Sequence, residues 1–333
     1  MSKLNIAVIC GGYSGEYDIS MKSAATIMEN LDPAKYEIFQ VILETSGWKV
    51  SDSLGQECSI VRADFSCDRQ GENLKFDAVI NAVHGTPGED GLIQGYFDML
   101  GIPYNSCDVL ISSLTFNKGF CNQYLKQTGI RVADSVLLLD PEERSVDEIL
   151  EVTGLPCFVK PNDGGSSIGV SKVKHKEEML PAIHKAFEAG NRVLIERFVQ
   201  GTEVTCGVIR KDGKVTPLAV TEIVFASEFF DYEAKYNSAD TQEITPARIS
   251  DDLYAKCMKI SAEIFERLNC KGFFRADFII QDGEFFLIEV NTVPGMSKMS
   301  LMPQMIEHAG LSLGTILDEQ ISEMVSGKKM AVN

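Results

Sequence analysis

The sequence lacks several patterns that would place it in a large class of proteins. Its nine cysteines are scattered and include no pair separated by two residues, so neither a zinc site nor a disulfide framework is indicated, and we expect reduced thiols. No apolar run approaches the length of a membrane-spanning helix, and the apolar stretch 6–10 is too short for a signal peptide. These absences favour a cytoplasmic protein without a membrane partner.

Positive charge is also scarce. Lys and Arg number 31 against 48 Asp and Glu, which gives a net charge of −17. Proteins that bind nucleic acid without sequence preference must neutralise phosphates, so this class is excluded and any phosphate site must be local. With 333 residues, 44% of them hydrophobic, and no repeats or low-complexity tract, the chain is expected to form two or three globular domains.

Strand and helix signals divide the chain into three parts. In the first part, strands alternate with a helix over 20–30, which predicts a doubly wound parallel sheet. A helical segment over 108–128 opens the second part, whose strands surround a helix over 176–189. Longer strands begin near residue 201. We therefore predict an α/β fold with three domains, at residues 1–107, 108–200 and 201–333.

The stretch 272–295 is the most informative, because it predicts a β-hairpin that carries oxygen ligands. Two apolar, strand-forming runs flank the turn signal Gln281-Asp282-Gly283. Asp277, Glu289 and Asn291 interrupt these runs. A buried carboxylate is costly unless a cation compensates its charge, so a cation is expected here.

The three oxygen ligands share one face of the hairpin if its loop has an odd number of residues, which a three-residue loop over 281–283 satisfies. Two carboxylates and one amide oxygen suit Mg²⁺, which completes its octahedron with water and phosphate oxygens. Arg275 shares the face of Asp277 and adds a positive charge. The alternative is a solvated strand edge with scattered charges, which the apolar flanking residues disfavour.

Two other segments carry weaker signals. Lys160 ends an apolar strand before a Gly/Ser-rich turn, so it offers a cation and backbone N–H groups to an anion such as a triphosphate. It is not a Walker A loop, since the lysine precedes the glycines, and an exposed lysine beside a glycine hairpin fits equally well. Glu196 and Glu203 could accept hydrogen bonds from an amine and from ribose hydroxyls, although the residues alone favour ordinary surface carboxylates.

These motifs follow an order that resembles the ATP-grasp superfamily: Lys160, the Gly/Ser-rich segment 164–170, the segment 195–199 with Glu203, Arg275-x-Asp277, and Glu289-x-Asn291-x-x-Pro294-Gly295. Within it, further motifs resemble the D-alanine–D-alanine ligase family: Gly11-Gly12-x-Ser14-x-Glu16, His84-Gly85-Thr86-x-Gly88-Glu89-Asp90-Gly91, Glu233-Ala234-Lys235-Tyr236 and Pro294-Gly295-Met296. The resemblance covers essentially the whole chain.

The resemblance implies a three-domain ATP-grasp architecture, in which an N-terminal doubly wound domain accompanies two α+β domains that sandwich ATP. The implied reaction phosphorylates the carboxylate of one D-alanine with ATP, and the amine of a second D-alanine then attacks the acyl phosphate. The products are D-alanyl-D-alanine for peptidoglycan synthesis, ADP and phosphate. ATP is the implied co-substrate, with two Mg²⁺ ions that Mn²⁺ can replace. A homodimer through the N-terminal domain is also implied.

The resemblance assigns a role to each site residue. The ATP contacts are Lys118, Lys160, Glu196, Phe198, Val199 and Glu203, and the metal ligands are Asp277, Glu289 and Asn291. The catalytic residues are Glu16, Ser166, Tyr236, Arg275 and Gly295. The substrate contacts are His84, Lys235, Ser300 and Leu301. From the residues alone, a structural histidine at the end of its strand fits His84 equally well, and a plain helix cap fits Ser300. Glu16 pairs with the first ammonium group, the start of a helix at Ser300 takes the second carboxylate, and the segment 225–245 is a lid that excludes water.

Some positions depart from the family pattern. Thr115-Phe116-Asn117 precede Lys118 where Ser-Met-Asp is usual, and this leaves the placement of Lys118 open. Tyr17-Asp18 follow Glu16 where Arg-Glu is common, but no proposed ligand is lost. Tyr236 argues for a D-alanine acceptor, since relatives that make the D-lactate ester lack it.

Three other interpretations remain. The first is a related ATP-grasp ligase of the D-Ala–D-Ser or D-Ala–D-lactate type, and the second is a catalytically silent nucleotide-binding protein. The third treats Gly11-Gly12-x-x-Gly15 as a dinucleotide fingerprint, but Cys10 stands where its first glycine belongs.

Overall fold

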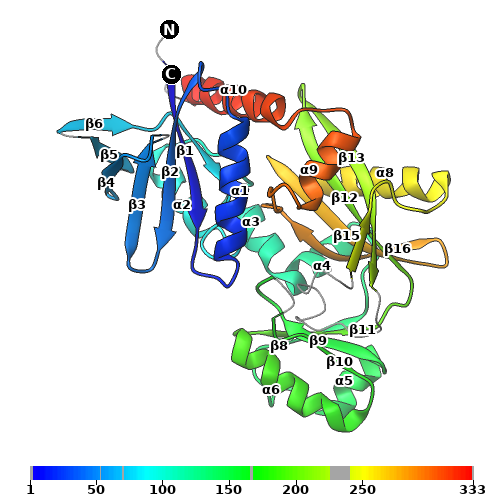
Figure 1. Cartoon of the computed structure of the whole chain (residues 1–333). Helices are drawn as coiled ribbons and strands as arrows, with labels where there is room; N and C mark the ends of the chain where they lie inside the picture. Colours follow the sequence, from blue (N-terminus) through cyan, green and yellow to red (C-terminus); the bar gives the residue numbers. More distant parts are fainter. Residues whose placement is uncertain (1–2, 53, 70, 166–167, 226–240, 332–333) are drawn as a thin grey trace.

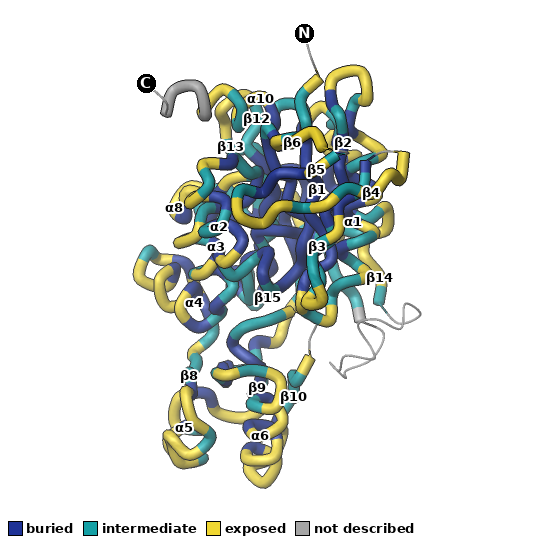
Figure 2. Tube along the Cα trace, turned by 90° about the vertical axis from the view of Figure 1, so that its left-hand side faces the viewer, coloured by how far each residue is buried: buried dark blue, intermediate teal, exposed yellow. Residues whose placement is uncertain are grey.

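The computed structural model describes residues 3–331, except residues 53, 70, 166–167 and 226–240. Within this part of the chain, three sheets with their covering helices form three lobes (Figure 1). We call them the N-terminal, central and C-terminal lobes. Figure 2 shows that buried residues run through the upper two lobes and form a separate, smaller core in the central lobe.

The N-terminal sheet has strand order β6-β5-β4-β3-β2-β1-β7. Strand β1 (Leu4–Gly11) lies between β2 (Tyr36–Glu44) and β7 (Ala78–Asn81) and is parallel to both. Alternate residues of β1 pack toward α1 (Tyr17–Asn30) on one face and toward α2 (Leu92–Leu100) on the other. Burial on both faces explains why the strand is a continuous apolar run. The predicted doubly wound parallel arrangement is confirmed for these three strands.

Four antiparallel strands extend this sheet beyond the prediction: β3 (Gly47–Asp52), β4 (Glu57–Val61), β5 (Ser66–Arg69) and β6 (Glu72–Lys75). They are short and mostly polar, so no clear apolar alternation marks them in the sequence.

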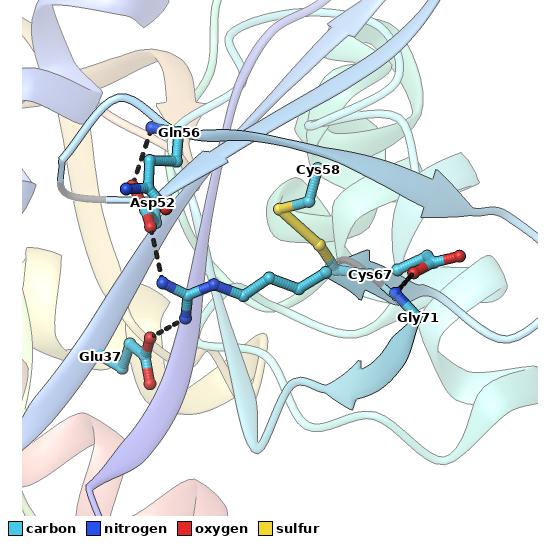
Figure 3. The surroundings of a disulfide bond; sticks show 8 residues. Glu37, Asp52, Gln56, Cys58, Cys67 and Gly71 are labelled. Atoms are coloured by element: carbon cyan, nitrogen blue, oxygen red, sulfur yellow. Dashed lines mark hydrogen bonds and ion pairs between the residues drawn. A yellow bond between two sulfur atoms is a disulfide. The ribbon is translucent and has the colours of Figure 1, made fainter.

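The prediction of reduced thiols is wrong for one pair of cysteines. Cys58 and Cys67 are joined by a disulfide between β4 and β5, with their Cα atoms 6.1 Å apart (Figure 3). Ile60 pairs with Cys67, so Cys58 occupies the diagonal position on the same face of the hairpin. Arg69 follows Cys67 by two residues, and its guanidinium bridges Asp52, at 3.0 Å, and Glu37, at 2.6 Å. The other seven cysteines are free and buried.

The central lobe is an antiparallel sheet of order β10-β9-β11-β8. Its strands are β8 (Ser135–Leu138), β9 (Cys157–Pro161), β10 (Ser171–Val173) and β11 (Val193–Arg197). Helices α5 (Val146–Thr153) and α6 (Met179–Ala189) cover one face, and a short 3₁₀ helix (Lys176–Glu178) precedes α6. A capping box of Ser145 and Glu148 starts α5.

The C-terminal sheet is antiparallel with order β14-β13-β12-β15-β16. Its strands are β12 (Thr202–Lys211), β13 (Lys214–Phe225), β14 (Thr241–Ile244), β15 (Phe273–Gln281) and β16 (Glu284–Asn291). The helices packed with it are α3 (Val109–Phe116), α4 (Lys118–Gln127), α8 (Asp251–Arg267) and α9 (Leu301–His308). The last helix, α10 (Leu313–Ala331), returns to the N-terminal lobe and packs on α1.

The helical segment predicted over 108–128 is two helices that meet at Asn117. The side chain of Asn117 accepts a hydrogen bond of 3.1 Å from the N–H of Phe120 and caps α4. Asn117, which departs from the family pattern, therefore acts as a cap and leaves Lys118 as the first residue of the new helix.

The hairpin turn is shorter than predicted. It has two residues, Asp282 and Gly283, both with positive φ, as a type I′ turn requires. The register instead shifts by one residue between Asp277 and Phe278, so that Asp277 pairs with Glu289 and Arg275 pairs with Asn291. A β-bulge thus supplies the odd residue that the loop was expected to supply, and the predicted shared face is confirmed by a different route.

One hydrophobic core crosses the boundary between the N-terminal and C-terminal sheets, and a second core lies within the C-terminal lobe. The first joins residues of β1 and α1 to Phe273, to α9 and to α10. The second joins α4 to β12, β15 and α8. The N-terminal and C-terminal lobes therefore share buried surface, whereas the core of the central lobe contains only its own residues. Among the described residues, no helix is long and apolar enough to cross a bilayer.

Candidate active site

A cleft of about 1170 Å³ lies where the lobes meet, and half of the predicted site residues line it. These are Glu16, Lys118, Lys160, Glu196, Phe198, Val199, Glu203, Asp277 and Glu289. They come from the loop between β1 and α1, from α4, from the central sheet and the segment that follows it, from β12, and from the hairpin. Residues that are far apart in the sequence are therefore brought to one cavity.

Lys160 and Glu196 form an ion pair in the central lobe. They lie on the neighbouring antiparallel strands β9 and β11, and their side chains are only 11% and 10% exposed. The amide of Asn122, on α4, donates a hydrogen bond of 3.2 Å to the other oxygen of the Glu196 carboxylate. Both charges are thus compensated although both groups are nearly buried, as a buried ion pair requires.

Lys118 lies at the N-terminus of α4, and its ammonium group faces both the Gly-rich loop and the hairpin. Its Nζ donates to the carbonyl of Gly164 and lies 3.4 Å from Oε2 of Glu289. The buried side chain of Asn162 accepts a hydrogen bond of 2.8 Å from the N–H of Gly119. Asn162 therefore fixes the start of α4 to the loop that follows Lys160.

The carboxylate of Asp277 is surrounded by donors. Nε and Nη2 of Arg275 each lie 2.9 Å from one of its oxygens, in a bidentate ion pair. Nδ2 of Asn291 lies 3.2 Å from Oδ2, and the hydroxyl of Thr205 donates to Oδ1. Burial lowers the pKa of Arg275, but the charge of Asp277 and the hydrogen bonds to it outweigh burial and raise the pKa above its ordinary value.

The hairpin presents hard oxygen donors in the number expected for a partly hydrated cation. Asp277 and Glu289 face each other across the paired strands, and Asn291 adds an amide. Within the described part of the chain, no three His, Cys, Asp or Glu side chains come together as a complete metal site. Two carboxylates and one amide fit a Mg²⁺ ion whose other ligands are phosphate oxygens and water.

Glu16 lies in the loop between β1 and α1, and the loop after β7 holds it in place. Its N–H donates to Oγ of Ser14 at 3.3 Å, and Ser14 Oγ donates to the carbonyl of His84 at 2.9 Å. The side chain reaches the Gly-rich loop, since a methyl group on Gly165 would lie 2.9 Å from Oε2 of Glu16. A glycine at position 165 therefore permits this close approach between two lobes.

His84 is buried behind this loop and does not line the cleft. Its Nε2 lies 3.1 Å from Oγ of Ser23, which accepts a hydrogen bond of 3.0 Å from the N–H of Met296. Burial lowers the pKa of His84, so the imidazole is neutral at pH 7. His84 thus connects the N-terminal lobe to the segment that carries Gly295.

Gly295 lies against the start of α9. A methyl group at this glycine would lie 2.9 Å from Oγ of Ser300. Ser300 occupies the N-cap position of α9, but its hydroxyl makes no capping bond and lies 2.7 Å from Oγ of Ser297. The first turn of α9 therefore keeps backbone N–H groups that no side-chain cap satisfies.

The end of the cleft near Glu196 is apolar and aromatic. The ring of Phe198 lies 5.8 Å from that of Phe158, and the ammonium group of Lys172 lies 3.7 Å above the Phe198 ring. Ile279, Leu287 and Ile288 of the hairpin form the opposite wall. Two apolar walls with acceptors at their rim suit a flat, nitrogen-rich ring such as adenine.

Comparisons with known proteins agree with this geometry. Residues 5–107 match the family model described as "D-ala D-ala ligase N-terminus", and residues 124–322 match "D-ala D-ala ligase C-terminus". The chain belongs to the D-alanine–D-alanine ligase family.

Individual members of this family resemble the chain over nearly its whole length. The D-alanine–D-alanine ligase of Phocaeicola vulgatus is 47% identical, over 96% of this chain and 98% of the relative. The VanG D-Ala:D-Ser ligase of Enterococcus faecalis superposes with a TM-score of 0.87 at 34% identity, over 96% of this chain and 99% of that one. The Bacillus anthracis ligase complexed with ATP gives 0.79 at 31% identity, over 99% and 100%. The predicted ATP-grasp fold and the prediction of a ligase that uses ATP are confirmed.

Three predicted residues of the ligase, Ser166, Lys235 and Tyr236, lie outside the described residues. The same holds for most of the predicted lid over 225–245. Arg275, Asn291, His84, Gly295, Ser300 and Leu301 are described but do not line the cleft itself. Arg275 and Asn291 adjoin it through Asp277.

Four residues that organise this ligase site were not predicted from the sequence: Asn122, Asn162, Lys172 and Thr205. Asn122 and Asn162 are nearly fully buried, and Thr205 is 2% exposed. A polar residue at a buried position of an apolar helix or strand is the signal that could have found Asn122 and Thr205. Lys172 gives no such signal, because lysine is common on short exposed strands.

Proposed function

We propose that this ligase joins two D-alanine molecules into D-alanyl-D-alanine for peptidoglycan synthesis, with ATP converted to ADP and phosphate. The observation that carries the proposal is the meeting of two lysines, Lys118 and Lys160, with the oxygen donors of the hairpin in one cleft. Phosphoryl transfer to a carboxylate depends on charge neutralisation and positioning, which this arrangement supplies without a protein nucleophile.

ATP would lie between the central and C-terminal sheets. The adenine ring would occupy the apolar end of the cleft, with the backbone of Phe198 and Val199 and the carboxylate of Glu196 at its edge. Glu203, which also lines the cleft, would accept hydrogen bonds from the ribose hydroxyls. Lys118 and Lys160 would bind the phosphates, and the ion pairs they now make with Glu289 and Glu196 support cationic side chains at these positions.

Two Mg²⁺ ions, which Mn²⁺ can replace, would be held by Asp277, Glu289 and Asn291 together with the ATP phosphates. When bound, such ions neutralise the charge that develops on the transferred phosphoryl group. The chain itself orients these ligands, since Thr205 and Arg275 hold the Asp277 carboxylate in one direction.

The first D-alanine would place its ammonium group beside Glu16, with Ser166 and Tyr236 completing a hydrogen-bonded network and His84 close by. Its carboxylate would face the γ-phosphate. Arg275 and the N–H of Gly295 would stabilise the oxyanion that forms when the second amine attacks. The second carboxylate would bind at the start of α9, beside Ser300 and Leu301, where the uncapped N–H groups lie. Lys235 would contact substrate from the lid over 225–245.

We also propose that the chain divides into three domains at residues 1–107, 108–200 and 201–333, and that it forms a homodimer through the N-terminal domain. We propose a cytoplasmic location, because the reaction consumes ATP.

The decisive experiment measures phosphate release from ATP and Mg²⁺ with D-alanine, with L-alanine, and with D-alanine plus D-lactate or D-serine, and identifies products by mass. Dipeptide from D-alanine alone supports the proposal. A preferred mixed product would show that D-serine or D-lactate, and not D-alanine, is the acceptor substrate. ATP binding without turnover for any of these substrates would refute the proposal.

A further inference from the structure

Asn122 is a buried amide on α4 to which the proposed mechanism gives no role. The residue is only 1% exposed and does not line the cleft. Its Nδ2 donates a hydrogen bond of 3.2 Å to Oε1 of Glu196, whereas among the described residues its Oδ1 has no hydrogen-bond partner. A buried polar atom without a partner costs stability, so an apolar residue would suit this position better unless the amide serves Glu196.

Chemistry decides which end of the amide faces Glu196. A carboxylate that pairs with a lysine is ionised and only accepts hydrogen bonds, so the nitrogen of Asn122 must face it. Turning the amide over would set two acceptor oxygens, Oδ1 and Oε1, against each other and would remove this hydrogen bond. The unpaired oxygen is therefore the consequence of a donor that is directed at Glu196.

The two partners of the Glu196 carboxylate differ in how firmly they are held. Among the described residues, Lys160 binds Oε2 and Asn122 binds Oε1. Lys160 has a long, flexible side chain, and the phosphates of ATP attract its ammonium group. Asn122 has a short side chain on a helix whose first turn is fixed by the hydrogen bond from Gly119 N–H to Asn162. When Lys160 turns to the phosphates, Asn122 therefore stays beside Glu196.

Helix α4 connects this contact with the phosphate end of the cleft. Lys118 and Asn122 are four residues apart and so lie on the same face of the helix. On another face, Cys121 and Leu125 pack into the C-terminal core. The helix lies between the C-terminal sheet and the central lobe (Figure 1), and Asn122 reaches from it to Glu196 on β11. One rigid element therefore holds both Lys118 and the partner of Glu196.

We propose that Asn122 is a positioning residue for the base of the nucleotide: it keeps the Glu196 carboxylate directed into the cleft, where that carboxylate accepts a hydrogen bond from the amino group of adenine. The inference rests on the proposed function, in which Glu196 lies at the edge of the adenine ring. Each carboxylate oxygen has two acceptor positions, so the bond from Asn122 leaves one position of Oε1 for the base. A purine that carries this amino group is thus preferred over the same purine without it.

The test is a calorimetric titration of two nucleotides into the full-length protein with Mg²⁺: ADP, and purine riboside diphosphate, which is ADP without its amino group. The wild type is expected to bind ADP about tenfold or more tightly, as a hydrogen bond to a charged acceptor gives. In Asn122→Leu, which keeps the size of the side chain but has no donor, this preference should fall below about threefold. The affinity for purine riboside diphosphate should stay as in the wild type.

Two further variants separate the lost donor from general damage. Asn122→Ala removes the same donor without adding apolar bulk and is expected to show the same loss of preference. Gln123→Leu is the matched control, since Gln123 is the next residue of α4 and is exposed, and it should keep the wild-type preference. Purine riboside diphosphate reports on folding in every variant, because a damaged cleft loses affinity for both nucleotides alike.

An unchanged preference for ADP in both Asn122 variants would overturn the inference, as would a wild type that binds the two nucleotides equally. An equal loss of affinity for both nucleotides in both variants would leave Asn122 a structural role alone and would also overturn it. None of these results bears on dipeptide formation, so the proposed function fails only in the separate experiment on products.

Discussion

The ammonium group of Lys118 lies 3.4 Å from the carboxylate of Glu289, across the space between α4 and the hairpin. The lysine proposed to bind phosphate and the residue proposed to bind metal thus neutralise each other. A nucleotide that arrives with its cation offers each of them a partner of the correct sign, because phosphate replaces Glu289 beside the lysine and the cation replaces the lysine beside Glu289.

Replacing Glu289 with glutamine is therefore expected to abolish most activity. The change keeps the shape but removes a negative charge that the cation needs, and a loss of about 10²-fold or more in kcat is expected, as for other preorganised charges. Phosphate release in the presence of D-alanine measures it. Glu284→Gln is the matched control on the same strand, where the carboxylate is 43% exposed and pairs with Lys256. Comparable losses in both variants would contradict the metal assignment.

The buried pair Lys160 and Glu196 gives a prediction on stability. Lys160→Met leaves Glu196 nearly buried without its cation, so the free energy of unfolding should fall by about 3 kcal/mol or more. The double variant Lys160→Met/Glu196→Gln should regain most of this loss, because no unpaired charge remains, yet it should not bind ATP.

Urea unfolding and nucleotide calorimetry check the two parts of this prediction. The exposed pair Lys176 and Asp147 is the control, with side chains 52% and 75% exposed. Lys176→Met should change the free energy of unfolding by less than about 1 kcal/mol. A double variant as unstable as Lys160→Met would argue against unpaired charge as the cause.

Alanine substitutions at two glycines of the hairpin region distinguish backbone strain from steric crowding. Both have positive φ, but Gly283 faces open space, whereas a methyl group at Gly272 would lie 2.0 Å from the carbonyl oxygen of Asn105. Gly283→Ala should cost only the backbone term, about 1–2 kcal/mol. Gly272→Ala must also push the lobes apart, so its urea midpoint should fall clearly further. Equal midpoints would show that the contact between Gly272 and Asn105 adjusts to the added methyl group without further loss of stability.

The raised pKa of Glu89 predicts how the free energy of unfolding depends on pH. A glutamate in the unfolded chain titrates near pH 4.5, whereas burial and Glu16 raise the pKa of folded Glu89 to about 8. The folded protein binds more protons between these values, so this group makes the free energy of unfolding fall as pH rises through the window. Glu89→Gln removes the fall. The melting temperature of the variant relative to wild type should therefore increase from about pH 5.5 to about pH 8.5. A constant difference would contradict the raised pKa.

The hairpin shows how far the sequence could predict the site. Apolar runs and a turn signal were enough to place Asp277, Glu289 and Asn291 on one face, because that conclusion needs only one extra residue somewhere between Asp277 and Glu289. Where the extra residue lies depends on which strand positions pair, and this is decided by packing of the whole C-terminal sheet. The loop was therefore predicted with three residues, although the structure has a two-residue turn and a bulge.

Other differences have similar causes. Asn117 breaks a segment whose two halves are both helical, and only its capping bond to Phe120 marks the boundary. The strands β3 to β6 owe their pairing to neighbours rather than to their own polar sequences. The pairing of Cys58 with Cys67 follows from the register of β4 and β5, which cysteine spacing does not reveal.

Because α10 packs on α1, the core that the first strand and helix begin can be covered only late in synthesis. Leu313, Ile316, Leu317 and Ile321 close the same core that Ile6, Val8 and Ile27 begin. One face of β1 and α1 thus stays uncovered until α10 has left the ribosome. Loss of the last helix to truncation or proteolysis would expose that face and make the remaining protein prone to self-association.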